Sequence, residues 1–182
     1  FAVKEPPKIN RKKVIGINIG VTGKLEGGDF AQFFQQMTIL CKKLNKDGWQ
    51  FKFFCVWSRD LHITEALISE SGIESAEIIQ EYYSANRFIR EVTDCRLMIS
   101  MKLHPLILSI CSCVPVIGLQ YQPKLRDFMT SITSESMLVH INPNLAQNCL
   151  EIVNRFDYDC VNQVHAQWLA CSELSEHFSA YL

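Results

Sequence analysis

The stretch Val14-Ile15-Gly16-Ile17-Asn18-Ile19-Gly20 decides the fold of this chain. Its apolar residues follow one another with little interruption and end at a glycine, which is typical of a short strand buried on both faces. The segment from Val21 to Gly28 has the glycines and polar residues of a loop. Strands buried on both faces belong to parallel sheets that helices cover from both sides, so this stretch predicts an α/β fold.

A long amphipathic helix is predicted directly after that loop. Asp29 can cap it, and the apolar residues from Phe30 to Leu44 recur at the three- and four-residue spacing of one helical face. The helix is expected to end between Asn45 and Gly48, because these residue types are common just beyond a helix C-terminus.

The alternation of strands and helices continues along the chain. Further strands are predicted at residues 51–57, 76–80, 96–101, 115–119 and 137–141, and helices at 61–71, 86–95, 104–113, 123–132, 143–156 and 161–181. Such alternation indicates a parallel sheet with right-handed crossovers. The simplest arrangement is a Rossmann-like doubly wound sheet with the strand order 3-2-1-4-5-6.

Length and composition predict one domain with a short basic appendage. The 182 residues are 48% apolar, which is enough for a large core, and the net charge of −1 argues against a protein that binds nucleic acid by neutralising phosphates. Residues 1–13 hold five basic residues against one acidic residue, a net charge of +4, together with Pro6 and Pro7. We therefore expect a linker or basic arm at 1–13 and the domain at 14–182. The longest apolar run, 106–119, is too short for a transmembrane segment.

The eight cysteines are expected to be reduced thiols of the core. Most lie within apolar periodic stretches, and the chain contains no Cys-x-x-Cys pair. Cys111 and Cys113 have no histidine pair nearby, so we expect no metal site and no cofactor. Reduced thiols and the absence of a recognisable signal peptide predict a cytoplasmic protein.

Candidate binding residues follow the strands that flank the point where the strand order reverses. In an open parallel sheet, ligands bind beyond the carboxyl ends of the strands at this point. The loops after the first, fourth and fifth strands hold Gly20, Lys102, His104, Tyr121 and Lys124. Backbone N–H groups of a glycine loop, with two ammonium groups, suit a phosphate or a carboxylate. The sequence therefore predicts a site for a small anion at this edge of the sheet.

Each of these residues also has a purely structural interpretation. A histidine at a helix start can be a general acid or base near neutral pH, but His104 can equally bond to a backbone carbonyl. A single loop lysine such as Lys102 is most often solvated. The loop that begins at Gly20 has neither the Gly-x-Gly-x-x-Gly pattern nor a P-loop pattern, so it does not identify a nucleotide site.

Three segments together resemble the polysaccharide pyruvyl transferase family. They are Met98–His104 (MISMKLH), Cys113–Leu119 (CVPVIGL) and Tyr121–Phe128 (YQPKLRDF). Members of the family typically show a strand, then Arg-x-His, an apolar helix, a Gly-x-Pro turn, another strand and Tyr-x-Pro-Lys. Gly16–Gly20 also resembles the strand that opens the C-terminal half of the family. The resemblance runs in register from Val14 to Phe128 and implies the C-terminal domain of a GT-B-type transferase, without its N-terminal partner domain.

The resemblance implies a transferase that moves the pyruvyl group of phosphoenolpyruvate onto a sugar of a cell-surface polysaccharide. His104 would then be the catalytic general acid. The residues that would bind substrate or anion are Lys102, Lys124, Tyr121, Gly20 and Asn18. The implied partners are phosphoenolpyruvate, a sugar or glycan acceptor and the missing N-terminal domain, with no nucleic acid.

Two positions depart from the family pattern. Lys102 stands where the family usually has arginine, and Cys113 stands where it usually has glycine. Lysine keeps the positive charge but loses the planar fork that grips a phosphate or carboxylate with two parallel hydrogen bonds. The first departure therefore bears on the affinity for the donor, and on activity itself.

Two other functions fit a domain of this kind. One is the nucleotide-sugar-binding half of a GT-B glycosyltransferase, which would need an acidic residue near the fifth strand to hold a ribose. Asp127 is the acidic residue in that region, but the sequence places it inside a predicted helix. The other is a non-catalytic relic or interaction domain that keeps the fold, which Lys102 and the missing half favour.

Overall fold

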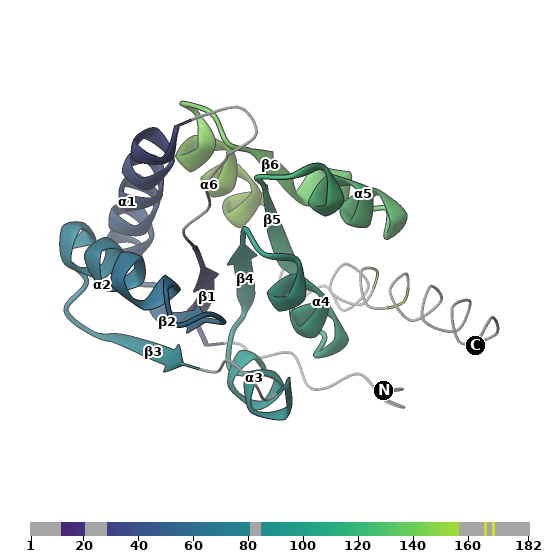
Figure 1. Cartoon of the computed structure of the whole chain (residues 1–182), viewed down its shortest axis with the longest axis horizontal. Coiled ribbons are helices and arrows are strands. Elements are labelled where there is room, and N and C mark those ends of the chain that lie inside the picture. The colour runs from purple at the N-terminus through teal and green to yellow at the C-terminus, as the bar shows by residue number, and fades with distance from the viewer. Residues whose placement is uncertain (1–11, 21–28, 81–84, 157–165, 167–168, 170–182) are drawn as a thin grey trace.

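Six parallel strands form one sheet in the order β3-β2-β1-β4-β5-β6 (Figure 1). The computed structural model describes residues 12–20, 29–80, 85–156, 166 and 169. The strands are β1 (Val14–Asn18), β2 (Gln50–Cys55), β3 (Ala76–Gln80), β4 (Leu97–Ser100), β5 (Val116–Gln120) and β6 (Leu138–His140). The predicted doubly wound sheet and its strand order are confirmed.

Helices connect the strands and cover the sheet. They are α1 (Phe30–Lys46), α2 (Asp60–Ser71), α3 (Ala85–Val92), α4 (Leu103–Cys111), α5 (Pro123–Ser131) and α6 (Leu145–Arg155). Helix α1 packs against α2 and α6, and α3 packs against α4 (Figure 1). Right-handed crossovers place the helices that lead toward β3 and those that lead toward β6 on opposite faces.

The helices begin and end where the sequence supplies the appropriate residues. The Asp29 carboxylate accepts a hydrogen bond from the backbone N–H of Gln32 at 2.9 Å and so caps α1. Gly72 ends α2 with φ at +65°, a left-handed conformation that glycine adopts without strain. A short 3₁₀ helix, Glu135–Met137, was not predicted. The predicted helix at 161–181 and the arm before residue 12 lie outside the described residues, apart from residues 166 and 169.

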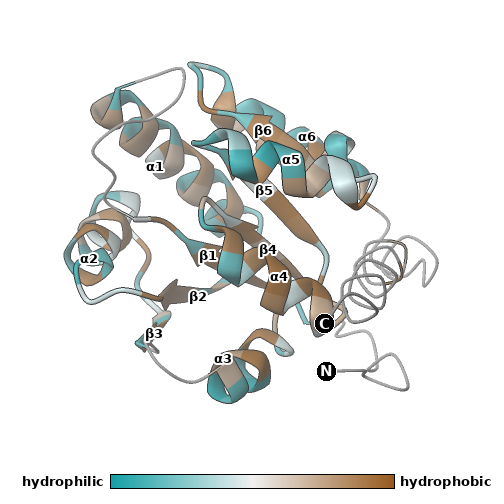
Figure 2. Ribbon diagram, turned by 45° about the vertical axis from the view of Figure 1, so that its right-hand side comes forward, coloured by the Kyte–Doolittle hydropathy of each residue, from teal (hydrophilic) through white to brown (hydrophobic). Residues whose placement is uncertain are grey.

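The core lies between the sheet and its two helical layers. All five residues of β1 and all five residues of β5 are buried, and the central strands appear in the brown of apolar residues in Figure 2. In register, Ile17 of β1 lies between Phe53 of β2 and Ile99 of β4. This apolar centre holds the carboxyl ends of β1 and β4 in fixed positions.

The described cysteines are free thiols. They are Cys41, Cys55, Cys95, Cys111, Cys113 and Cys149, and the other two lie outside the described residues. Burial raises the pKa of the Cys41 thiol to about 12, which keeps it protonated at neutral pH. Among the described residues, no group of three or more histidine, cysteine, aspartate or glutamate side chains is arranged to hold a metal ion. None of the helices in the described part of the chain is long and apolar enough to cross a membrane.

Candidate functional site

A network of buried polar groups lies at the carboxyl ends of β1 and β4, where the strand order reverses. Asn18 ends β1 and Ser100 ends β4, and the two residues are paired in register. Both are completely buried. The loops that follow β1 and β4 therefore begin next to each other, at the edge of the sheet where ligands bind in open parallel sheets.

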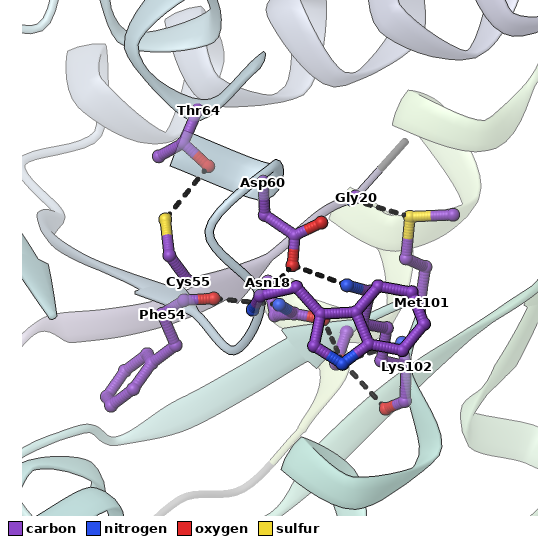
Figure 3. Close-up of polar contacts among 10 residues, drawn as sticks. Asn18, Gly20, Phe54, Cys55, Asp60, Thr64, Met101 and Lys102 are labelled. Atoms are coloured by element: carbon purple, nitrogen blue, oxygen red, sulfur yellow. Dashed lines mark hydrogen bonds and ion pairs between the residues drawn. The ribbon is translucent and has the colours of Figure 1, made fainter. Parts of the chain in front are cut away.

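Asn18 joins three strands through its side chain. Its amide group donates a hydrogen bond to the backbone carbonyl of Phe54 at 2.7 Å (Figure 3). Its amide oxygen accepts a hydrogen bond from the Ser100 hydroxyl at 3.0 Å. The same hydroxyl accepts a hydrogen bond from the backbone N–H of Lys102 at 3.0 Å. Asn18 therefore fixes the backbone from which the Lys102 side chain projects, and direct contact between Asn18 and a ligand stays a prediction.

Lys102 is buried and forms an ion pair with Asp60. Its side chain is 11% exposed, its Nζ contacts Oδ2 of Asp60, and Asp60 is completely buried (Figure 3). The expectation of a solvated lysine is therefore wrong. The reason is the strand order: β2 lies next to β1, so the loop after β2 delivers a carboxylate to the loop after β4.

A tight turn from Trp57 to Asp60 presents that carboxylate. The backbone N–H of Asp60 donates to the carbonyl of Trp57 at 2.9 Å, and the backbone N–H of Trp57 donates to Oδ2 of Asp60 at 3.2 Å. Asp60 is also the first residue of α2, where the helix dipole favours a negative charge. Its other oxygen, Oδ1, is buried without a hydrogen-bond partner in the described structure.

The indole of Trp57 lies against two cations. The Nζ of Lys102 is 3.9 Å from the ring centroid, and the guanidinium carbon of Arg59 is 4.1 Å from it. Both distances are within the range of cation–π attraction. Trp57 is nevertheless 50% exposed, so one large aromatic side chain remains open to solvent beside the ion pair.

The ion pair with Asp60 does not fully offset the effect of burial on the pKa of Lys102. Burial lowers the pKa of Lys102, Asp60 raises it, and the nearby charge of Arg59 lowers it further, so that the pKa lies below its ordinary value. Lys52 of β2 is a comparison within the same chain. Burial lowers the pKa of Lys52 too, but three carboxylates at 2.7–3.2 Å outweigh burial and raise it. A lysine pKa that is shifted by burial and by specific charged neighbours is typical of a functional site.

Gly20 is the residue that lets the Lys102–Asp60 pair form. A Cβ atom at this position would lie 2.6 Å from Cε of Lys102 and 2.7 Å from Oδ1 of Asp60, which is closer than atoms can approach. The backbone N–H of Gly20 is directed at the Met101 sulfur at 3.0 Å. The remainder of the predicted glycine loop, residues 21–28, lies outside the described residues.

The other predicted site residues lie near the same edge but are exposed to different degrees. His104 is exposed and occupies the second position of α4. Tyr121 is half-buried after β5, and the exposed ammonium of Lys124 lies 6.0 Å from the centroid of its ring. The structure thus brings Asn18, Gly20 and Lys102 together, whereas Tyr121 and Lys124 form a separate pair on the loop after β5.

Sequence reasoning missed the loop after β2, which contributes Trp57, Arg59 and Asp60. The signal was present, because the strand order 3-2-1-4 places the end of β2 beside the end of β1. An aspartate one residue after an arginine, directly behind a buried strand, could have been included on that ground alone.

We expect Lys102 and Asp60 to be strongly coupled in stability. Lys102→Met and Asp60→Asn should each lower the free energy of unfolding by about 3–5 kcal/mol, because each leaves one buried charge unpaired. The double variant should lose less than the sum of the two. Urea unfolding of the full-length protein measures these values.

An exposed pair provides the matched control. Arg126 and Asp127 lie 3.4 Å apart with both side chains more than half exposed. Arg126→Gln and Asp127→Asn should couple by less than about 1 kcal/mol. Additive effects at Lys102 and Asp60 would contradict the buried ion pair.

Three comparisons relate the chain to known proteins. Residues 2–123 match the family model described as polysaccharide pyruvyl transferase. None of the curated protein sequences compared with the chain matches it. Several solved structures share the fold. TarM is 14% identical, with a TM-score of 0.58, over 97% of this chain and 34% of its own. An O-GlcNAc transferase variant from Thermobaculum terrenum is 9% identical, with a TM-score of 0.59, over 96% and 36%.

A third structure, the α,α-trehalose 6-phosphate synthase of Burkholderia multivorans, is 16% identical, with a TM-score of 0.51, over 94% of this chain and 42% of its own. At such identities the likeness concerns the fold, and it confirms the predicted similarity to domains of GT-B-type transferases. The chain spans about a third to two fifths of the length of these proteins.

Proposed function

Because the chain belongs to the polysaccharide pyruvyl transferase family, we propose that it is the part of a transferase that binds phosphoenolpyruvate and passes its pyruvyl group to a sugar of a polysaccharide. The observation that carries this proposal is Lys102, a buried cation with a lowered pKa at the reversal point of the sheet. A buried cation at the carboxyl edge suits an anionic donor.

The chemistry of the donor fits cations on two loops. Phosphoenolpyruvate carries a phosphate and a carboxylate, and the phosphate leaves as an anion. Lys102 on the loop after β4 and Lys124 on the loop after β5 would each face one of these groups. Fixed positive charges stabilise a leaving phosphate more in a water-poor site than in solution.

A pyruvate ketal requires one proton donor and two sugar hydroxyls. One proton adds to the methylene carbon C3 of the donor, and two sugar oxygens form bonds to C2. The C2–O bond to phosphate breaks, and of the two hydroxyl protons one replaces the proton given to C3 and the other leaves with phosphate. His104 would supply the proton to C3, since imidazole exchanges protons near neutral pH.

A second domain would complete the site. The chain spans only part of the length of the solved structures that share its fold. We therefore infer that the sugar acceptor is held between this domain and a segment outside it. The absence of a cofactor and a cytoplasmic location stay predictions.

Ligand-dependent thermal stability tests the substrate class. Phosphoenolpyruvate should raise the melting temperature of the full-length protein, whereas UDP and GDP should not. The alternative of a nucleotide-sugar site needs an acidic residue near β5, and Asp127 instead lies in α5 beside Arg126. Stabilisation by the nucleotides alone would contradict the proposal, and stabilisation by no ligand would favour a non-catalytic domain.

His104→Gln should lower kcat for ketal formation by about 10²- to 10⁴-fold, because it removes the proposed proton donor. The KM for phosphoenolpyruvate should change little, since His104 is exposed and is not among the anion-binding residues. Steady-state kinetics of the full-length protein with a glycan acceptor measures both values. His140→Gln, on the exposed end of β6, is the matched control and should leave kcat unchanged. An unaltered kcat in His104→Gln would exclude this role.

Donor affinity should depend on pH through Lys102. The pKa of Lys102 lies below the ordinary lysine value of 10.5, so the ammonium loses its proton when the pH rises through this lowered pKa. The donor then loses a positively charged partner. Lys102→Arg should retain affinity through that range, because a guanidinium stays charged. Calorimetric titration of phosphoenolpyruvate from pH 7 to pH 10, with circular dichroism to confirm folding, makes the comparison. Identical pH profiles for the two proteins would remove Lys102 from the anion site.

A further inference from the structure

The turn after β2 buries one of its two charged residues and exposes the other. Asp60 points inward to Lys102, while Arg59 is exposed and lies against the indole of Trp57. Two hydrogen bonds between Trp57 and Asp60 hold the turn closed. The position of Arg59 is therefore set by the same contacts that position the buried ion pair.

The charge balance of the site leaves Arg59 as an uncompensated cation beside Lys102. Asp60 offsets part of the charge of Lys102, so Lys102 alone offers a substrate anion less than a full positive charge. Arg59 forms no ion pair with a carboxylate in the part of the chain that the structure describes. Arg59 and Lys102 each lie about 4 Å from the same ring centroid, so their charges are at most about 8 Å apart. The influence of Arg59 on the pKa of Lys102 agrees with this proximity.

Stacking leaves the hydrogen-bonding edge of a guanidinium available. A guanidinium on an aromatic face uses its flat surface for the contact, and its N–H groups point outward in the plane. That edge can bind a carboxylate or a phosphate through two parallel hydrogen bonds. Lys102 cannot offer this geometry, because an ammonium is a single point of charge.

A second observation at the same turn points to a missing hydrogen-bond donor. Oδ1 of Asp60 is completely buried and has no hydrogen-bond donor within the described structure. A buried carboxylate oxygen without a donor costs free energy, so a water molecule or a bound hydroxyl is expected to fill this place. It lies next to the backbone of Gly20, at the loop where the donor was predicted to bind.

We propose that Arg59, stacked on Trp57, is an anion-binding residue of this site and grips the carboxylate or phosphate of the donor in the bidentate manner that Lys102 cannot. This inference rests on the proposed function. It assigns to the loop after β2 the anion-binding role that the family resemblance implies for the arginine usually found at the position of Lys102. Trp57 is then a positioning residue that holds the guanidinium flat.

Calorimetric titration of the full-length protein with phosphoenolpyruvate, and separately with inorganic phosphate, tests the inference. Arg59→Gln should weaken binding of phosphoenolpyruvate by about 10- to 100-fold, because a charge-assisted bidentate contact is lost. Arg59→Lys should recover only part of the affinity, since it restores charge without the fork. Arg90→Gln is the matched control: Arg90 is an exposed arginine of α3, 72% exposed and beside Glu91, and its loss should leave both affinities unchanged.

The outcomes separate this inference from the proposed function. If the wild-type protein binds phosphoenolpyruvate and Arg59→Gln binds it equally well, the bidentate role of Arg59 is overturned. The same holds if Arg59→Lys binds it as tightly as the wild type. In both cases the proposed function stands. Binding of inorganic phosphate that depends on Arg59, without any binding of phosphoenolpyruvate, would support the anion site and overturn the proposed donor. Binding of neither probe by the wild-type protein would overturn both. Circular dichroism and urea unfolding of each variant ensure that a loss of affinity reflects the site, because Arg59 is exposed and its replacement should not unfold the chain.

Discussion

The buried ion pair between Lys102 and Asp60 is the interaction on which the site depends. Each partner is costly to bury alone, and the pair repays that cost only while both are present in good geometry. The pair joins the loop after β4 to the loop after β2, which lie on either side of β1. Asn18 stands between them and bonds to both neighbouring strands. Removing any one of these groups would leave a buried polar atom unsatisfied, so they are expected to persist or fail together.

The arrangement of charge divides the site into a closed and an open part. The closed part is the ion pair beside Trp57, which joins the loops after β2 and β4 and in which Asp60 offsets part of the charge of Lys102. The open part consists of the exposed side chains Arg59, His104 and Lys124. Recognition of a multiply charged donor would therefore need Arg59 and Lys124 of the open part in addition to Lys102, while the closed part fixes where these side chains stand.

The fold was predictable because each strand carries its own signal. The apolar run from Val14 and the glycine that ends it are local features, and the alternation of elements leaves few possible strand orders. Only the part of the site that follows from topology was predictable. Strand order places Lys102 at the edge of the sheet, but it does not show that a carboxylate from another loop forms an ion pair with it. In the sequence, Asp60 stands just before the predicted helix at 61–71, where an aspartate is common. Its burial depends on how the turn from Trp57 folds back, which is a tertiary property without a local signature. The 3₁₀ helix at Glu135–Met137 was missed for the opposite reason, because three residues are too few to show a period.

The unpartnered oxygen of Asp60 shows what a lysine at position 102 does not supply. Where the family pattern has arginine, a forked side chain would contact both oxygens of a carboxylate placed as Asp60 is. Lys102 reaches one oxygen and leaves the other without a donor. One of the two acceptors of this carboxylate is therefore unused, and a single replacement of Lys102 by arginine would offer a donor to each of them.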